Sequence, residues 1–372
     1  MSPAPSPEAR FVVAAVREEE GRSPGAAVSH AAGVANWTAV VDLAARNGVT
    51  AYVRRRMARL SDEVPAKIRA SLRDAEIAAV GSTLALDAEL SRVVSTFRGE
   101  GLETLVLKGP VLARTLYPEV VLRPYSDVDI VVRTAEFDRA ARCLAGLGFR
   151  ELPYEAEIAR VAFADAGAEE PFHRMFLGPA DRSLIELHAD PLQLGLRPVQ
   201  EDARWRRAVP LAWLASEAVA LSDEDQVVQL AVHVHKHGFS RLIWLKDLDM
   251  LVRRRGAHLD WDLVRSVSKA EGVGASVWFA LSLARDVLGT PRTPADALAP
   301  SPPIRALYEL TWPRARVAAL EMTMRRRAVQ FHAAESWRGT LPTLVLMGRR
   351  RERLRLMFRA LRGRGGARGS PA

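Results

Sequence analysis

Apolar residues recur at helical spacing through the N-terminal part of the chain. The stretch WTAVVDLAARNGVTAYVRRRMARL begins at Asn36, a residue type that commonly caps helices, and is interrupted once, at Asn47 and Gly48. The long segment that follows keeps alanine and leucine at helix-compatible intervals. These patterns predict a helical region over residues 36–100, with residues 1–35 as a partly disordered lead-in.

Shorter apolar runs, typical of β-strands, follow this helical region. ETLVLKG predicts a strand that enters a glycine turn, PVLARTLYP a helix that stops at Pro118, and DVDIVVR a strand with alternating faces. A helix from Thr134 to Gly148, a strand from Phe149 and a hairpin of FHRMFLG with SLIELHAD complete the series. This order predicts an α+β fold in which a small mixed β-sheet core, over residues 101–195, is flanked by helical regions.

The signals after Pro191 are helical again. DEDQVVQLAVHVHKHG, RLIWLKDLDMLVRRRG, WDLVRSVSKAEG and ASVWFALSLARDVLG predict a helical domain over residues 196–290 that packs on the core. TPRTPADALAPSPP predicts a proline-rich surface loop or linker over residues 291–303. We expect arginine-rich helices over residues 304–363 and a disordered tail over residues 364–372.

Positive charge is concentrated at the C-terminal end. The chain carries a net charge of +9, but residues 304–372 alone contain 16 Arg and no Lys against 4 Glu, a balance of +12 that leaves −3 for the rest. A neutral body with a basic end predicts an appended contact surface for phosphates, either RNA or anionic lipid. A solvated helix face followed by a flexible end is the alternative.

Three observations bear on location. No apolar run approaches the roughly 18 residues that a membrane-spanning helix needs, so we predict no transmembrane segment. The N-terminal stretch MSPAPSPEAR lacks the basic region and apolar core of a secretory signal. The single cysteine, Cys143, has no partner in the chain with which to form a disulfide. Together these features predict a cytoplasmic protein.

Two carboxylates occur close together in one apolar run. Asp127 and Asp129 are two residues apart on a predicted strand, so both side chains project from the same face. Such carboxylates repel one another unless a cation or proton lies between them, and Mg²⁺ prefers oxygen ligands of this kind. Solvated acids at a strand end are the alternative. A two-metal site needs a further carboxylate, and the candidate is Glu186 in LIELHAD, which could instead face outward on an edge strand.

The turn at Lys108 and Gly109 combines features that favour a phosphate group. Glycine permits close backbone approach, a helix N-terminus favours anions, and lysine supplies a positive charge. An ordinary strand-to-helix turn is the alternative, since no P-loop pattern is present. Arg123, held extended by the proline that follows it, could bind a phosphate or pair with the two aspartates.

Histidines add further candidates. His188 is expected on the same strand face as Glu186, where it could contact a phosphate, orient Glu186 or complete a hydrogen bond within the sheet. His233 and His237 lie one helical turn apart, but no H-E-x-x-H zinc pattern is present. We expect these two histidines and Asp247 on a helix region that lies against the site, either near substrate or in a hydrogen-bonded core.

In their order these motifs resemble a known family. LKG, R-P-x-x-D-x-D, E-L-H and H-x-x-x-H with a following W-x-x-D are similar to the motifs of the uncharacterised nucleotidyltransferase family within the DNA polymerase β-type superfamily. The resemblance extends from about residue 36 to about residue 290. It implies a mixed sheet with three metal-binding carboxylates, here Asp127, Asp129 and Glu186, and Mg²⁺ or Mn²⁺ as the cofactor.

The same resemblance implies how a nucleotide is held and used. Lys108, Gly109, Arg123 and Ser126 would contact the phosphates, although Lys-Gly-Pro stands here where the wider superfamily has Gly-Ser. The implied activity is transfer of a nucleoside monophosphate from an NTP to the hydroxyl of an unidentified acceptor, whether small molecule, RNA or protein. The alternative is a non-catalytic nucleotide- or peptide-binding module whose arginine-rich tail docks on a partner.

Overall fold

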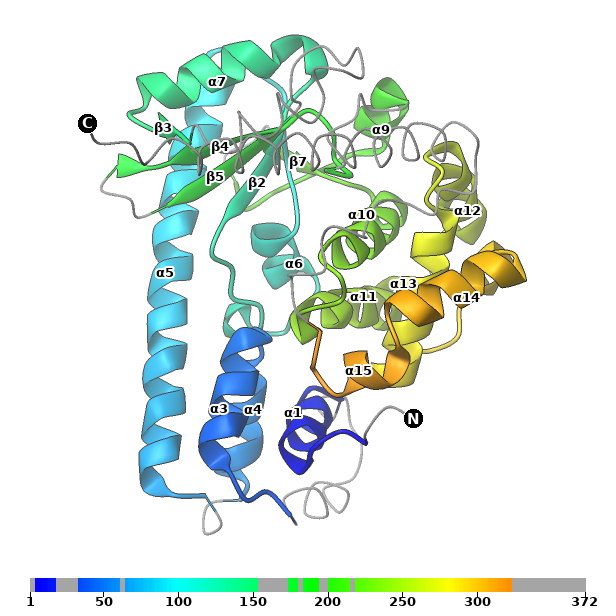
Figure 1. Ribbon diagram of the computed structural model, residues 1–372. Helices are drawn as coiled ribbons and strands as arrows, with labels where there is room; N and C mark the ends of the chain where they lie inside the picture. The colour runs from blue at the N-terminus through cyan, green and yellow to red at the C-terminus, as the bar shows by residue number, and fades with distance from the viewer. Residues whose placement is uncertain are drawn as a thin grey trace, which may run out of the picture.

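A computed structural model gives the structure of the chain and describes residues 4–17, 33–60, 64–152, 173–179, 183–193, 200–214 and 218–322 (Figure 1). Within these residues a seven-stranded mixed sheet is flanked by helices, which confirms the predicted α+β fold. In Figure 1, α7 lies above the sheet and α10 below it.

The strands follow the predicted order and add two that were not predicted. They are β1 Thr104–Val106, β2 Val128–Val131, β3 Arg150–Glu151, β4 His173–Leu177, β5 Leu184–His188, β6 Val209–Pro210 and β7 Ala218–Ala220. Their spatial order is β3-β4-β5-β2-β1-β7-β6. The predicted hairpin is the antiparallel β4–β5 pair, while β2 runs parallel to β5 and β1 runs parallel to β7. The sheet therefore extends beyond the predicted boundary at residue 195.

The helices are α1 Pro7–Arg17, α3 Trp37–Arg46, α4 Thr50–Ala58, α5 Ala66–Gly99, α6 Gly109–Thr115, α7 Phe137–Gly146, α9 Glu201–Arg207, α10 Asp223–Lys236, α11 Leu242–Arg255, α12 Trp261–Ala270, α13 Gly274–Leu288, α14 Pro302–Thr311 and α15 Arg314–Ala318, with short 3₁₀ segments η2 Val120–Leu122, η3 Thr134–Glu136 and η6 Pro294–Leu298. The predicted cap at Asn36 is present, since its side chain accepts a hydrogen bond from the Ala39 N–H at 3.0 Å. Helices are present over residues 36–100 as predicted, whereas the expected helical domain over residues 196–290 contains α9 to α13 but also the strands β6 and β7. None of the described helices is long and apolar enough to cross a membrane.

The two faces of the central strands differ in chemistry. Val128 and Ile130 of β2, with Ile185 and Leu187 of β5, are fully buried in a core that also includes apolar residues of α5 and α7. Because side chains alternate along a strand, the intervening residues project from the opposite face. That face carries the acidic and histidine side chains, on the side where α10 packs.

Part of the N-terminal lead-in, which was expected to be partly disordered, is helical. Residues 7–17 form α1, and Phe11, Val12 and Val16 have no exposed surface. The Phe11 ring packs edge-on against Trp37 of α3, with ring centroids 5.4 Å apart. An apolar helix face buried this fully is held by tertiary packing. Residues 1–3 and 18–32 lie outside the described part of the chain.

The proline-rich segment is exposed at most of its residues, as a surface loop is, but it is also anchored to the core. It contains η6, whose Ala295 and Leu298 are buried in the same core as α13. The segment is therefore part of the packed helical domain. The arginine-rich region begins with α14 and α15, where Tyr308 and Trp312 are buried. The rest of the expected helices and the tail, residues 323–372, lie outside the described residues.

Candidate active site

Two of the predicted carboxylates are neighbours across strands. Asp129 of β2 is the register partner of Glu186 on the parallel strand β5. Asp127 comes directly before β2 and is partly buried, whereas Asp129 is only 3% exposed. Since β5 lies between β2 and β4, the alternative that placed Glu186 on an edge strand is wrong. The sheet thus brings acidic side chains from two core strands to one face.

Lys108 reaches into this acidic cluster from the turn after β1. Its ammonium nitrogen lies 3.0 Å from Asp129 Oδ2, donates a 2.8 Å hydrogen bond to Gln193 Oε1, and lies 3.3 Å from His233 Nδ1. The Lys108 backbone has φ 47° and ψ −117°, a conformation that is costly for a residue with a Cβ. Surrounding contacts therefore hold a strained residue at the site.

Gly109 has a packing reason to be glycine. A Cβ at this position would lie 2.7 Å from Tyr125 Cβ, closer than real Cβ contacts come. Gly109 is buried, and the Tyr125 ring covers the space that its missing side chain leaves. The group that packs closely against Gly109 is thus the Tyr125 side chain of the same chain.

The acids differ in their affinity for protons. Burial, together with the charges of Asp129 and Glu186, raises the pKa of Asp127 to about 6. Burial acts in the same direction on Asp129, but the Lys108 ammonium and a hydrogen bond from His188 outweigh it and lower the pKa of Asp129. Glu186 behaves likewise, because interactions with His173 and His188 outweigh its burial and lower its pKa. Asp127 is therefore the acid whose negative charge is least compensated.

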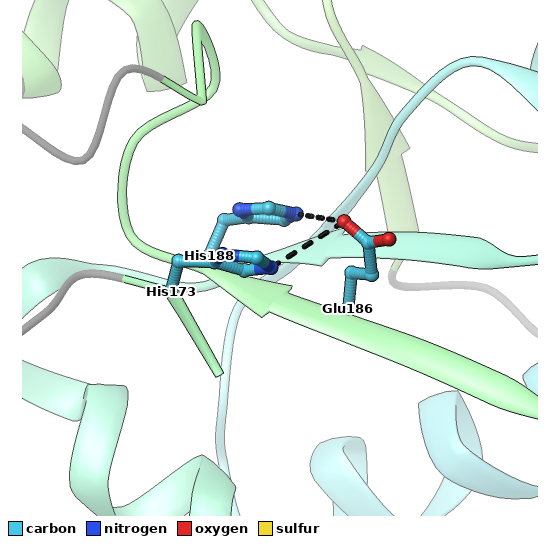
Figure 2. A group of neighbouring side chains, drawn as sticks. All are labelled: His173, Glu186 and His188. Carbon is cyan, nitrogen blue, oxygen red and sulfur yellow. Dashed lines mark ion pairs between the residues drawn. The ribbon is translucent and has the colours of Figure 1, made fainter. Parts of the chain in front are cut away.

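Two stacked histidines border the carboxylates (Figure 2). His173 of β4 and His188 of β5 are cross-strand partners, and their rings lie parallel with centroids 4.5 Å apart. His188 Nε2 is 3.2 Å from Asp129 Oδ1 and 3.6 Å from Glu186 Oε2. His188 therefore contacts both acids, which is consistent with the expected role of orienting Glu186. His173 was not among the candidates from the sequence.

Arg123 pairs with Asp247 and not with Asp127 or Asp129. Its guanidinium donates to both oxygens of Asp247, at 2.7 and 2.8 Å, and Asp247 also accepts a 2.7 Å hydrogen bond from Tyr117. Arg123 and Asp247 thus form a buried bidentate ion pair that joins the segment before β2 to helix α11. Of the two expectations for Asp247, a hydrogen-bonded core is the one the structure matches.

The remaining candidates lie around the cluster. His233 contacts Lys108, and burial with the nearby Lys108 charge lowers the pKa of His233 well below its ordinary value. His237 packs on His233 and Trp244, with centroids 4.6 and 4.8 Å away. Ser126 is exposed, and its hydroxyl is 3.5 Å from Asp127 Oδ1.

Two polar residues near the carboxylates were missed from the sequence. The Gln193 side-chain amide donates to Asp129, and the Gln193 backbone carbonyl accepts a 3.0 Å hydrogen bond from the Lys236 ammonium. Burial and the neighbouring Lys108 charge lower the pKa of Lys236 to about 8. Gln193 has φ 58° in a loop, so its position depends on backbone geometry that sequence spacing does not reveal. Lys236 could have been found as the residue on α10 one helical turn after the predicted His233.

A mixed sheet that presents acids from adjacent strands beside a lysine-bearing turn is the arrangement implied for a nucleotidyltransferase core. Residues 34–289, more than half of the chain, match the family described as uncharacterised nucleotidyltransferase. The chain belongs to this family, which confirms the resemblance seen in its motifs. Comparison with curated proteins and with solved structures gives no match.

Proposed function

We propose that this protein is a Mg²⁺-dependent nucleotidyltransferase that transfers a nucleoside monophosphate from an NTP to a hydroxyl group of an acceptor. The observation that carries the proposal is the pairing of Asp129 with Glu186 on parallel core strands, with Asp127 two residues before Asp129. Family membership supports transfer of a nucleotidyl group in general. The carboxylates make the metal-dependent version of that chemistry the best supported.

The donor atoms fit the expected cofactor. Asp127, Asp129 and Glu186 offer carboxylate oxygens, which Mg²⁺ and Mn²⁺ prefer. Burial, together with the negative charges of Asp129 and Glu186, raises the pKa of Asp127, and a divalent cation beside it would favour its ionised form. When bound, such a cation neutralises charge on the triphosphate and favours attack at the α-phosphorus.

Basic residues of the chain can hold the triphosphate beside these acids. Lys108 and Lys236 both lie within reach of Gln193, so two ammonium groups border the same side of the cluster. Lysine is a suitable point charge for phosphate oxygens. On nucleotide entry the Lys108 ammonium would exchange its contact with Asp129 for one with a phosphate. The acceptor hydroxyl oxygen would then form the new bond to phosphorus while pyrophosphate leaves and a carboxylate of the cluster takes the hydroxyl proton.

Transfer of label tests this proposal directly. The full chain is incubated with α-phosphate-labelled NTPs, Mg²⁺ and a cell lysate, and labelled products are separated into protein, RNA and small-molecule fractions. We expect Mg²⁺-dependent label in one fraction and its loss with Asp129→Asn. Label that appears equally with the wild-type and Asp129→Asn proteins, or with neither, would contradict the proposal.

One observation favours the second candidate, a non-catalytic nucleotide-binding module. The Lys108 ammonium, 3.0 Å from Asp129, places a protein cation where a metal ion would be needed. If that ion pair is permanent, nucleotides should bind with the same affinity with and without Mg²⁺. Peptide recognition and a docking role for the arginine-rich tail belong to the same candidate and concern residues 323–372 in part.

A further inference from the structure

Three potential metal ligands share one face of the β4–β5 hairpin. Glu186 and His188 are two residues apart on β5, so their side chains leave the same face, and His173 is the direct cross-strand partner of His188. One ligand atom from each of the three residues lies within 4.8 Å of the others. The arrangement is set by strand register, so the three side chains start from rigid backbone positions.

The two imidazoles converge on one carboxylate oxygen. His173 Nε2 is 3.4 Å and His188 Nε2 is 3.6 Å from Glu186 Oε2, and Figure 2 shows the other Glu186 oxygen turned away from both rings. His173 Nε2 is buried, and its 3.4 Å contact with Glu186 Oε2 does not have the geometry of a hydrogen bond, nor does any other contact within the described residues. A buried polar atom without a hydrogen bond is uncommon and points to a missing partner.

The two nitrogen-to-oxygen spacings suit a shared ion, toward which the stacked imidazole rings would have to turn. Zinc bonds to histidine nitrogen and carboxylate oxygen measure about 2.0–2.2 Å, so two ligands of a tetrahedral ion are separated by about 3.4 Å. Both nitrogen-to-oxygen distances here are close to that value. Two imidazoles and one carboxylate favour a transition-metal ion such as Zn²⁺ over Mg²⁺, which prefers oxygen ligands alone.

We infer that His173, Glu186 and His188 form a binding site for a transition-metal ion of the Zn²⁺ class, beside the Asp127–Asp129 pair. Three protein ligands would leave the fourth position of a tetrahedral ion for water or substrate. It shares Glu186 with the proposed active site, but binding of the ion does not depend on nucleotidyl transfer. The described residues include a competing arrangement, in which a proton on His188 bridges Asp129 and Glu186.

Cobalt is a suitable probe, because Co²⁺ occupies zinc sites and absorbs visible light when its coordination number is low. The tag-free full chain is freed of metal with a chelator and titrated with Co²⁺ in the presence of excess Mg²⁺. We expect saturable visible absorption at a single equivalent. His173→Ala and Glu186→Gln should each weaken binding about tenfold or more. His258→Ala, at an exposed histidine of the helical domain, is the matched control and should bind as the wild type does.

Two outcomes would overturn the inference. Absence of Co²⁺ binding would leave the histidines as ion-pair partners of the acids. Equal binding by the wild type and His173→Ala would place the ion elsewhere. Asp127→Asn separates the two proposals, because it should retain the Co²⁺ absorption while losing Mg²⁺-dependent nucleotide binding. Intact Co²⁺ binding in a wild-type chain that binds no nucleotide would defeat only the proposed transfer.

Discussion

Two buried charge clusters, both containing residues of the segment 105–133, differ in how completely their charges are matched. In the first, Arg123 and Asp247 have side chains 6% and 1% exposed and meet through two hydrogen bonds. In the second, Lys108 and Asp129 are similarly buried, at 8% and 4%, but Glu186 and Asp127 add negative charge. Burial alone therefore does not separate the structural pair from the candidate site.

The difference lies in charge balance and in unused bonding capacity. Asp247 has one guanidinium and one tyrosine hydroxyl as partners, so both of its oxygens are satisfied. Around Asp129, three carboxylates face two lysines, Lys108 and Lys236, and two histidines, and buried His188 Nδ1 has no hydrogen-bond partner among the described residues. A matched cluster holds a fold together, whereas an acidic surplus on a rigid strand pair invites a cation.

The largest expected effect concerns the matched pair. Arg123→Ala leaves the Asp247 charge buried without its partner, so we expect the free energy of unfolding to fall by about 3–5 kcal/mol. Urea denaturation measures this change. Arg265→Ala, which removes a surface pair with Asp262 on α12, is the control and should cost less than about 1 kcal/mol. Equal, small effects of the two substitutions would remove the structural role assigned to Arg123.

The next prediction concerns how the stability of an Asp127 variant depends on pH. The pKa of Asp127 is about 6 in the folded state against an ordinary 3.8, so its contribution to stability is present below pH 3.8 and is lost as pH rises through 6. We therefore expect metal-free Asp127→Asn to gain stability relative to wild type between pH 4 and 7, by at most about 3 kcal/mol.

Substitution of Asp129 should change the stability in the opposite direction in the same experiment. Its pKa is lowered, so its contribution is present at neutral pH and is lost as pH falls through the folded-state pKa. Asp129→Asn should therefore be less stable than wild type at pH 7, with a gap that narrows in acid. Chemical denaturation at several pH values measures both variants. The same sign for both substitutions would refute the charge balance described for the cluster.

A smaller effect is expected at the lysine turn. Lys108→Met removes an ammonium group proposed to contact phosphate and should weaken binding of a non-hydrolysable NTP analogue about tenfold, the value of one hydrogen bond to a charged group. Calorimetric titration measures the affinity. Lys269→Met, at an exposed position of α12, is the control. Unchanged affinity of Lys108→Met for the analogue would show that Lys108 does not contribute to nucleotide binding.

Strong local patterns made much of the fold predictable. The Asn36 cap, the Asn47 break and the alternation around Asp129 are local features, and each lies where expected. Short β7 was missed because three residues of the type Ala-Val-Ala carry no alternation signal, and pairing with β1 alone defines the strand. Helix α1 was missed because its burial depends on distant partners.

The site was predictable to the extent that strand register is. Asp129 and Glu186 follow from alternation within core strands. His173 could have been found by extending the predicted hairpin, since Leu177 pairs with Leu184 and counting back along both strands reaches His173 and His188. The pairing of Arg123 with Asp247 of α11 could not have been predicted from the sequence, because it depends on packing between segments far apart in the chain.

Nucleotide binding with and without Mg²⁺ shows whether the carboxylate cluster binds a metal ion together with the nucleotide. A non-hydrolysable NTP analogue is titrated into the wild-type chain and into Asp129→Asn, whose folded state is checked by denaturation. We expect Mg²⁺ to tighten binding to the wild type by about tenfold or more and to have no such effect on Asp129→Asn. Affinity that is the same with and without Mg²⁺, or an equal response to Mg²⁺ in Asp129→Asn, would contradict this expectation.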